Sequence, residues 1–78
     1  MFILTGDKKK LIDVDRLELI RIEPRGSSAS VIGYGYDDDT GELIGFYADK
    51  ADAIATIEEI ADALARDQRV VKLTVEAI

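Results

Sequence analysis

The chain has 78 residues, with 10 Lys and Arg against 16 Asp and Glu, and therefore a formal net charge of −6. It contains no Cys, no His and no Trp, which excludes disulfides, thiolate nucleophiles, Cys-type zinc sites and imidazole bases. The length allows one domain, residues 1–78, with one thin core. We therefore expect a non-enzymatic protein with no cofactor, no metal site and no catalytic residue.

Residues 2–4 form a short apolar segment that we expect to be a strand. A polar, lysine-rich turn follows at residues 5–10, and residues 11–14 are expected to return as a second strand. The N-terminal apolar run is shorter than the roughly 7–15 residues of a signal-peptide core. No stretch approaches the ~20 apolar residues of a transmembrane helix. These lengths favour a soluble, cytoplasmic protein that binds no membrane.

Residues 17–23 are expected to form a third strand. Their apolar and polar alternation slips between Leu19 and Ile20, so either a β-bulge lies there or both faces of the strand are partly covered. Pro24 has no N–H for a ladder and is expected to end the strand. Residues 25–28, which include one Gly and two Ser, are then predicted to form a turn.

Residues 29–36 and 43–48 give the clearest hairpin signal, joined by the acidic segment 37–42. Most aromatic side chains of the chain lie in this hairpin, interleaved with glycines: Tyr34, Tyr36, Phe46 and Tyr47 with Gly33, Gly35 and Gly45. The pairing register of the two strands decides which of these side chains reach the core.

Two registers are compatible with this hairpin. A three-residue loop ending at Gly41, which accepts positive φ easily, would bury Ile32, Tyr34, Tyr36, Ile44, Phe46 and Ala48. A loop of two or four residues would instead bury Gly33, Gly35, Ile44 and Phe46 and expose Ile32, Tyr34, Tyr36, Leu43 and Tyr47. We favour the first register because it gathers the large apolar groups on one face. In either register the second face is a candidate for partner binding or self-association.

A helix is predicted over about residues 50–67. Asp49 is a good N-cap, and Asp52 places a carboxylate in the first turn, where the helix dipole favours it. Apolar residues at helical spacing predict one buried stripe of Ile54, Ile57, Ala61 and Leu64, flanked by Ala53 and Ile60. A last strand at about residues 70–76 is expected to pair with an N-terminal strand. This order predicts an α+β fold, with an antiparallel sheet of about five to six strands and the single helix packed on one face.

Negative charge is concentrated in residues 31–60, which hold eight acidic residues and one basic residue, a net charge of −7. We expect a partner-binding surface on the hairpin tip and the helix, formed by Asp37, Asp38, Asp39, Glu42, Asp52, Glu59 and Asp62, with Tyr47 beside them. Such a surface repels nucleic acid and attracts a basic protein, including a nucleic-acid-binding one. The alternative is that the charge only keeps the protein soluble.

The chain also resembles a loose group of short, uncharacterised bacterial and prophage-type proteins. The resemblance is carried by Met1-Phe2-Ile3-Leu4, Lys8-Lys9-Lys10, Ile12-Asp13-Val14-Asp15, Gly45-Phe46-Tyr47 and the capped helix from Asp49 through Ala53, Ile57 and Ile60. In size and charge the chain is similar to phage anti-CRISPR proteins. The resemblance implies a phage or mobile-element accessory or inhibitor protein and implies no catalytic or binding residue. The alternative is a structural domain that forms a homodimer through the Gly- and Tyr-containing face of the sheet.

Overall fold

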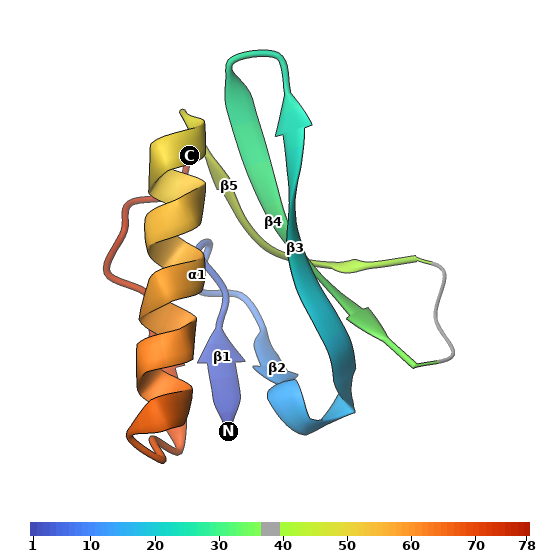
Figure 1. Cartoon of the computed structure of the whole chain (residues 1–78), viewed down its shortest axis with the longest axis vertical. Helices are drawn as coiled ribbons and strands as arrows, with labels where there is room; N and C mark the ends of the chain where they lie inside the picture. The colour runs from blue at the N-terminus through green and yellow to red at the C-terminus, as the bar shows by residue number, and fades with distance from the viewer. Residues whose placement is uncertain (37–39) are drawn as a thin grey trace.

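A computed structural model describes residues 1–36 and 40–78 of the chain. Its elements in chain order are β1 (Phe2–Leu4), β2 (Leu11–Asp13), a 3-10 helix (Val14–Arg16), β3 (Leu17–Arg25), β4 (Ser28–Gly35), β5 (Glu42–Tyr47), α1 (Lys50–Ala65) and β6 (Val70–Lys72) (Figure 1). Within the described residues, these six strands and one α-helix confirm the predicted α+β class.

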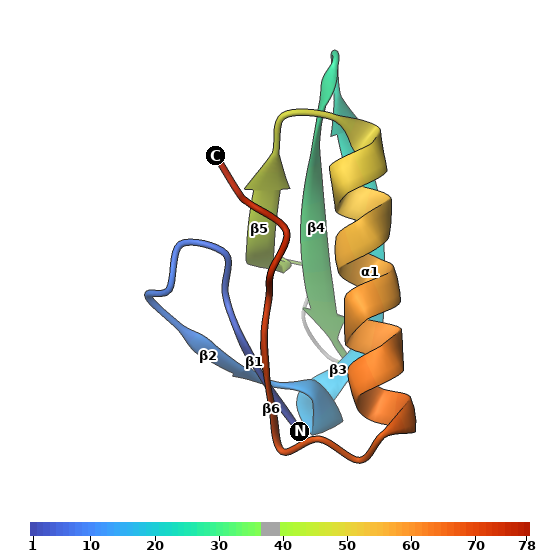
Figure 2. The same cartoon turned by 90° about the vertical axis from the view of Figure 1, so that its left-hand side faces the viewer.

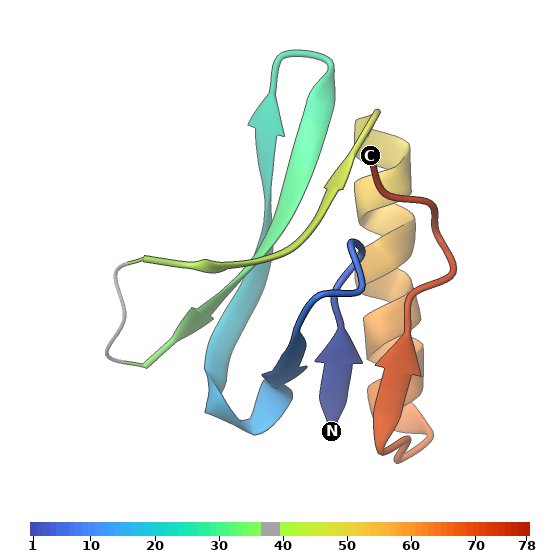
Figure 3. The ribbon, with the colours of Figure 1, turned by 180° about the vertical axis from the view of Figure 1, so that it is seen from behind.

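The strands form two three-stranded sheets, whereas the sequence predicted one antiparallel sheet. One sheet has the order β2-β1-β6 and the other the order β3-β4-β5. The C-terminal strand pairs with an N-terminal one, as predicted, but β6 lies parallel to β1, with Ile3 opposite Val71. Figure 3 shows β1 and β6 side by side, and Figure 2 shows α1 lying along the β3-β4-β5 sheet. The helix therefore packs against both sheets.

The C-terminal strand is shorter than predicted because the chain leaves β1 after Lys72. Beyond that residue the backbone turns toward the other sheet, and the Ile78 N–H donates a hydrogen bond to the Phe46 carbonyl at 2.7 Å. The apolar side chains of Leu73, Val75 and Ala77 still pack against the core. The C-terminal segment thus links the two sheets.

β3 continues through Pro24 to Arg25, whereas the sequence predicted that it would end at Pro24. β3 is an edge strand, and an edge strand tolerates Pro because the missing N–H can face away from the ladder. The pairing with β4 shifts between Leu17 and Leu19, so a bulge is present just before the predicted slip. Gly26, at φ 61°, begins the turn into β4, a conformation that glycine adopts easily.

β4 and β5 pair in a register that matches neither prediction, because the ladder shifts at a bulge at Ile44. The bulge lets Ile44 and Tyr47 both face the core, where they are 1% and 0% exposed. On β4 the buried inward positions are Ala29, Val31 and Gly33. The favoured register is therefore wrong for the side chains that lie outside the core: Ile32, Tyr34, Tyr36, Phe46 and Ala48.

The helix begins as predicted, with the Asp49 side chain accepting a hydrogen bond from the Asp52 N–H at 2.9 Å. It ends at Ala65, two residues earlier than predicted, and Asp67 adopts a positive φ of 55°. Asp67 follows the C-cap Arg66, and a left-handed residue just after the C-cap is a common way to end a helix.

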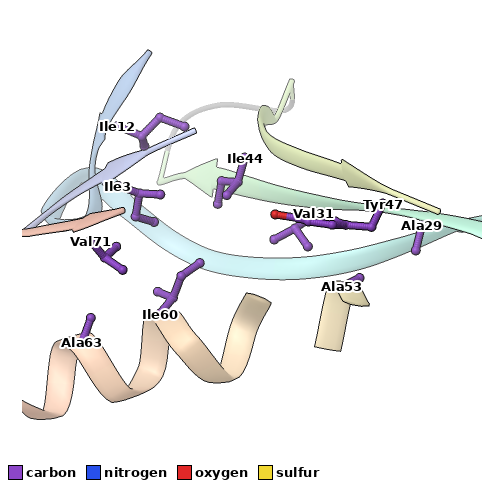
Figure 4. Close-up of a cluster of buried hydrophobic side chains, with 10 residues drawn as sticks. All are labelled: Ile3, Ile12, Ala29, Val31, Ile44, Tyr47, Ala53, Ile60, Ala63 and Val71. Carbon is purple, nitrogen blue, oxygen red and sulfur yellow. The ribbon is translucent and has the colours of Figure 1, made fainter. Parts of the chain in front are cut away.

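The buried face of α1 differs from the predicted stripe. Its buried side chains are Ala53, Thr56, Ile60 and Ala63. Ile54 and Leu64, predicted to be buried, are 43% and 46% exposed. Three of the four buried residues are small, which lets the helix approach the sheets closely. Figure 4 shows Ile60 and Ala63 directed at Ile3 and Val71.

Candidate partner-binding surfaces

The acidic residues predicted to bind a partner do not form one continuous surface among the described residues. Asp37, Asp38 and Asp39 lie outside the described residues. Glu42 is exposed at the base of the hairpin tip, where its carboxylate accepts a hydrogen bond from Lys10 Nζ at 3.2 Å. This ion pair neutralises the Glu42 charge locally.

On α1, the predicted acidic residues have different environments. Asp52 is half-buried in the first turn, and its carbonyl accepts a hydrogen bond from Thr56 Oγ1 at 3.0 Å. The Glu59 carboxylate accepts hydrogen bonds from the Thr74 N–H at 2.9 Å and from Thr74 Oγ1 at 2.8 Å. Glu59 therefore holds the C-terminal segment against the helix. Asp62 is exposed, as is its neighbour Glu58.

Tyr47, predicted to be part of the same binding surface, is a core residue. It is fully buried, and Figure 4 shows its ring lying lengthwise beside Val31. The bulge at Ile44 causes this difference, because it changes the face to which the end of β5 points. Tyr47 is therefore unavailable to a partner in the folded protein.

Several exposed or half-buried apolar and aromatic side chains lie on the face of the β3-β4-β5 sheet that points away from α1. We call this surface the outer sheet face. It consists of Leu19, Arg21 and Glu23 on β3, Ile32 and Tyr34 on β4, and Leu43 and Phe46 on β5. Leu43 is 49% exposed, and Tyr36, at the end of β4, is 70% exposed.

A hydrogen-bonded group of three side chains lies across β3 and β4 on this face. The Arg21 guanidinium is 4.7 Å from the centroid of the Tyr34 ring and 2.9 Å from the Glu23 carboxylate. The Tyr34 hydroxyl donates to that same carboxylate. These two donors, Tyr34 first and then Arg21, hold the pKa of Glu23 below its ordinary value. The pKa of Arg21 is raised by its hydrogen bonds to Glu23 and Tyr34. The group is therefore charged and ordered before any partner arrives.

A shallow hollow lies beside this group on the outer sheet face. It is lined by Arg25, Ser30, Ile32, Gly41, Leu43 and Phe46. A Cβ at Gly41 would lie only 2.1 Å from Ile32 Cγ2, so the glycine is required where the loop crosses the hollow. The Arg25 guanidinium forms no salt bridge within the described part of the chain.

A second hollow lies where the two sheets diverge. Phe2 and Leu11 contribute apolar surface, and Leu11 is 60% exposed. The Lys10–Glu42 ion pair and the Arg16 side chain also line it. Because the sequence predicted one sheet, it did not predict a hollow between two.

A third exposed apolar surface lies on α1 and is formed by Ile54, Ala61 and Leu64. We call it the α1 flank. These are three of the four residues of the predicted buried stripe; all three are exposed, while Ile57 is half-buried. Their helical spacing puts them on one side of the helix, so the sequence grouped them correctly but placed the group on the wrong face.

Within the described residues there is no group of three or more His, Cys, Asp or Glu that could hold a metal ion. No helix in this part of the chain is long and apolar enough to cross a membrane. Comparison with protein-family models, curated proteins and solved structures finds no match. The resemblance to prophage-type and anti-CRISPR proteins therefore stays a prediction.

Proposed function

We propose that this protein is a non-enzymatic protein-binding module that recognises its partner through the outer sheet face. The observation that carries the proposal is the collection of large apolar and aromatic side chains on this face: Leu19, Ile32, Tyr34, Leu43 and Phe46. Tyr, Phe and Arg are enriched in the centres of protein interfaces, and Tyr and Arg are among the most frequent hot-spot residues. A protein partner suits this face because its described residues span three strands and surround only a shallow hollow.

The ordered group of Arg21, Glu23 and Tyr34 supports this proposal. Side chains that are already held in place lose less conformational entropy when a partner binds. The adjacent hollow adds a place for an apolar side chain, with Arg25 at its rim. The chemistry of the face therefore fits a partner segment that presents an apolar side chain next to a carboxylate.

A second candidate is recognition of a basic partner by the solvent side of α1. Glu58 and Asp62 are exposed there, one helical turn apart, and Asp62 belongs to the acidic surface predicted from the sequence. Binding through such exposed charges weakens steeply with salt, whereas binding through an apolar face does not.

Affinity capture from a source-cell lysate, with variants and two salt concentrations, separates the candidates. Leu43→Asp places a charge in the outer sheet face at a half-exposed position, where we expect the fold to tolerate it. Glu58→Lys with Asp62→Lys reverses the helix charges. Leu11→Asp is the matched control, because it makes the same chemical change at another exposed strand position. All variants are first checked for a wild-type circular dichroism spectrum.

We expect one protein to be retained at raised salt, lost with Leu43→Asp, and kept with Leu11→Asp and with the double helix variant. A protein that is lost at raised salt and with the helix variant, but kept with Leu43→Asp, would replace this proposal with the second candidate. If Leu43→Asp and the helix variant each capture the same protein as the wild type, and in the same amount, both candidate surfaces are refuted.

A further inference from the structure

The outer edge of β3 is the open edge of the β3-β4-β5 sheet. At the opposite edge, the Gly6 N–H donates a hydrogen bond to the Ile44 carbonyl of β5 at 2.8 Å. The C-terminal Ile78 covers β5 in the same way through its hydrogen bond to Phe46. Within the described residues no element other than β4 forms backbone hydrogen bonds with β3. A nine-residue strand with one bare edge is a template for pairing with another strand.

Alternate backbone groups of β3 point toward this open edge. Arg25 and Ser28 flank the two-residue turn 26–27 and form a hydrogen-bonded pair across it. Along an antiparallel ladder from such a pair, every second residue of β3 points its N–H and C=O away from β4. Ile20, Ile22 and Pro24 occupy these outward positions. Ile20 and Ile22 each offer one donor and one acceptor, and Pro24 offers its carbonyl alone.

The α1 flank lies on the same side of the molecule as this edge. Ile54, Ala61 and Leu64 lie on the side of the helix away from Glu59, whose carboxylate contacts the C-terminal segment beyond β6. Figure 1 shows β3 passing in front of β4, and Figure 2 shows α1 and β3 on the same side of β4. A bare strand edge thus lies next to an exposed apolar helix surface.

We propose that a second copy of this chain occupies this side of the molecule, through an antiparallel two-fold pairing of β3 with β3 centred on Ile22. In this register the two Ile22 residues exchange a pair of backbone hydrogen bonds. Each Ile20 N–H donates to the Pro24 carbonyl of the second copy. Arg21 then lies directly opposite Glu23 of the second copy, at both symmetric positions, and opposite charges at such cross-strand positions attract.

The charges of β3 select both this register and this occupant. Centring the pair on Ile20 would place Arg21 opposite Leu19 of the second copy and would lose the charge pairing. Centring it on Pro24 would remove the central hydrogen bonds, because proline has no N–H. A second copy also brings a second exposed α1 flank to the same side of the joined sheet. A two-fold pair uses each open edge once and is closed.

The dimer interface is the open edge of β3, and it shares Arg21 and Glu23 with the outer sheet face that the proposed function assigns to a foreign partner. The pairing would join the two outer sheet faces side by side as one six-stranded surface. It would leave Leu43, Phe46 and the hollow between them exposed on both copies. Failure of the dimer would therefore leave the proposed function standing, and the reverse also holds.

Sedimentation equilibrium of the full chain, at concentrations from about 5 to 500 µM, tests the proposal. Arg21→Glu places two Glu residues opposite each other at both symmetric positions, and Glu23→Arg does the same with two Arg. The double variant with both changes restores opposite charges in the same register. Lys9→Glu, in the exposed turn after β1, makes the same change of charge away from the interface. Circular dichroism confirms that each variant is folded.

We expect a wild-type dimer whose dissociation constant rises about tenfold or more in each single variant, because two attractive pairs become two repulsive ones. We expect the double variant to return toward the wild-type value and Lys9→Glu to match it. Independently of any variant, the amides of Ile20 and Ile22 should exchange more slowly with solvent as the wild-type concentration increases. A monomer throughout the range, a dimer insensitive to Arg21→Glu, or no recovery in the double variant would each overturn the proposal.

Discussion

We expect the buried hydroxyl of Tyr47 to destabilise the folded protein. The side chain is fully buried, and its Oη has no hydrogen-bond partner within the described residues. The nearby hydroxyl of Thr56 offsets part of the pKa rise of Tyr47. It donates its own hydrogen to the Asp52 carbonyl and so cannot also donate to Tyr47, and its geometry does not let it accept a hydrogen bond from Tyr47 Oη. Burying a hydroxyl without a partner costs about 1–3 kcal/mol.

Tyr47→Phe removes that oxygen and keeps the ring in place. We expect the free energy of unfolding to rise by about 1–2 kcal/mol, since the gain from removing the unpaired group is reduced by the small void it leaves. Urea denaturation followed by circular dichroism measures the change, and the dependence on urea concentration should stay as in the wild type. Tyr36→Phe is the matched control; Tyr36 is largely exposed, so its stability should stay within about 0.5 kcal/mol of wild type.

The same hydroxyl makes stability depend on alkaline pH. Burial raises the pKa of Tyr47 above its ordinary value. Below about pH 10 the tyrosine is protonated in both the folded and the unfolded chain, so its ionisation costs no stability there. As pH rises above about 10, the unfolded chain loses this proton while the folded protein keeps it, and stability falls by up to about 1.4 kcal/mol per pH unit. The gap in stability between Tyr47→Phe and wild type should therefore widen between pH 9 and 11.

Two results would refute this reasoning. A loss of more than about 1 kcal/mol in Tyr47→Phe at pH 7 would mean that the hydroxyl makes a favourable hydrogen bond in the folded protein. A gap that stays constant between pH 9 and 11 would mean that Tyr47 ionises equally in both states and is accessible to solvent.

Three further substitutions test other contacts. Gly45→Ala would place a Cβ 2.5 Å from Tyr47 Oη; we expect a loss of about 1–3 kcal/mol in urea denaturation, and a loss under 0.5 kcal/mol would contradict the close approach. Glu59→Ala removes the acceptor of both Thr74 hydrogen bonds; we expect faster amide exchange at Thr74 than in the control Glu58→Ala, and equal exchange would show that this contact does not hold the segment. Asp49→Ala removes the N-cap of α1 and should lower stability by about 1 kcal/mol; no change in thermal unfolding would argue against the cap.

The helix illustrates how far the sequence determines the fold. Its start at Asp49 follows from local chemistry, because an N-cap acts within one turn, and the prediction was confirmed. Its buried face was predicted wrongly because the helix carries two series at helical spacing, one of larger apolar residues and one of Ala53, Thr56, Ile60 and Ala63. The series of smaller residues is buried because two sheets pack against the helix. That tertiary packing cannot be read from the sequence of the helix alone.

The predicted register of the β4-β5 hairpin was wrong for a related reason. A single bulge at Ile44 reverses the faces of the residues on one side of it, and nothing local in the sequence marks that residue. The bulge moved Tyr47 from the predicted binding surface into the core. The outer sheet face was partly foreseeable, since the alternative register already exposed Ile32, Tyr34 and Leu43 together.

The pairing of β1 with β6 has a consequence for the order in which the protein folds. Ile3 pairs with Ile12 nine positions along the chain, but with Val71 68 positions along it. The longer loop is about three doublings longer than the shorter one, so closing it costs about 2 kcal/mol more in chain entropy. Long-range pairs of this kind slow folding. During synthesis β1 is made well before residues 70–72, so we expect the core around Ile3 and Val71 to close late in folding.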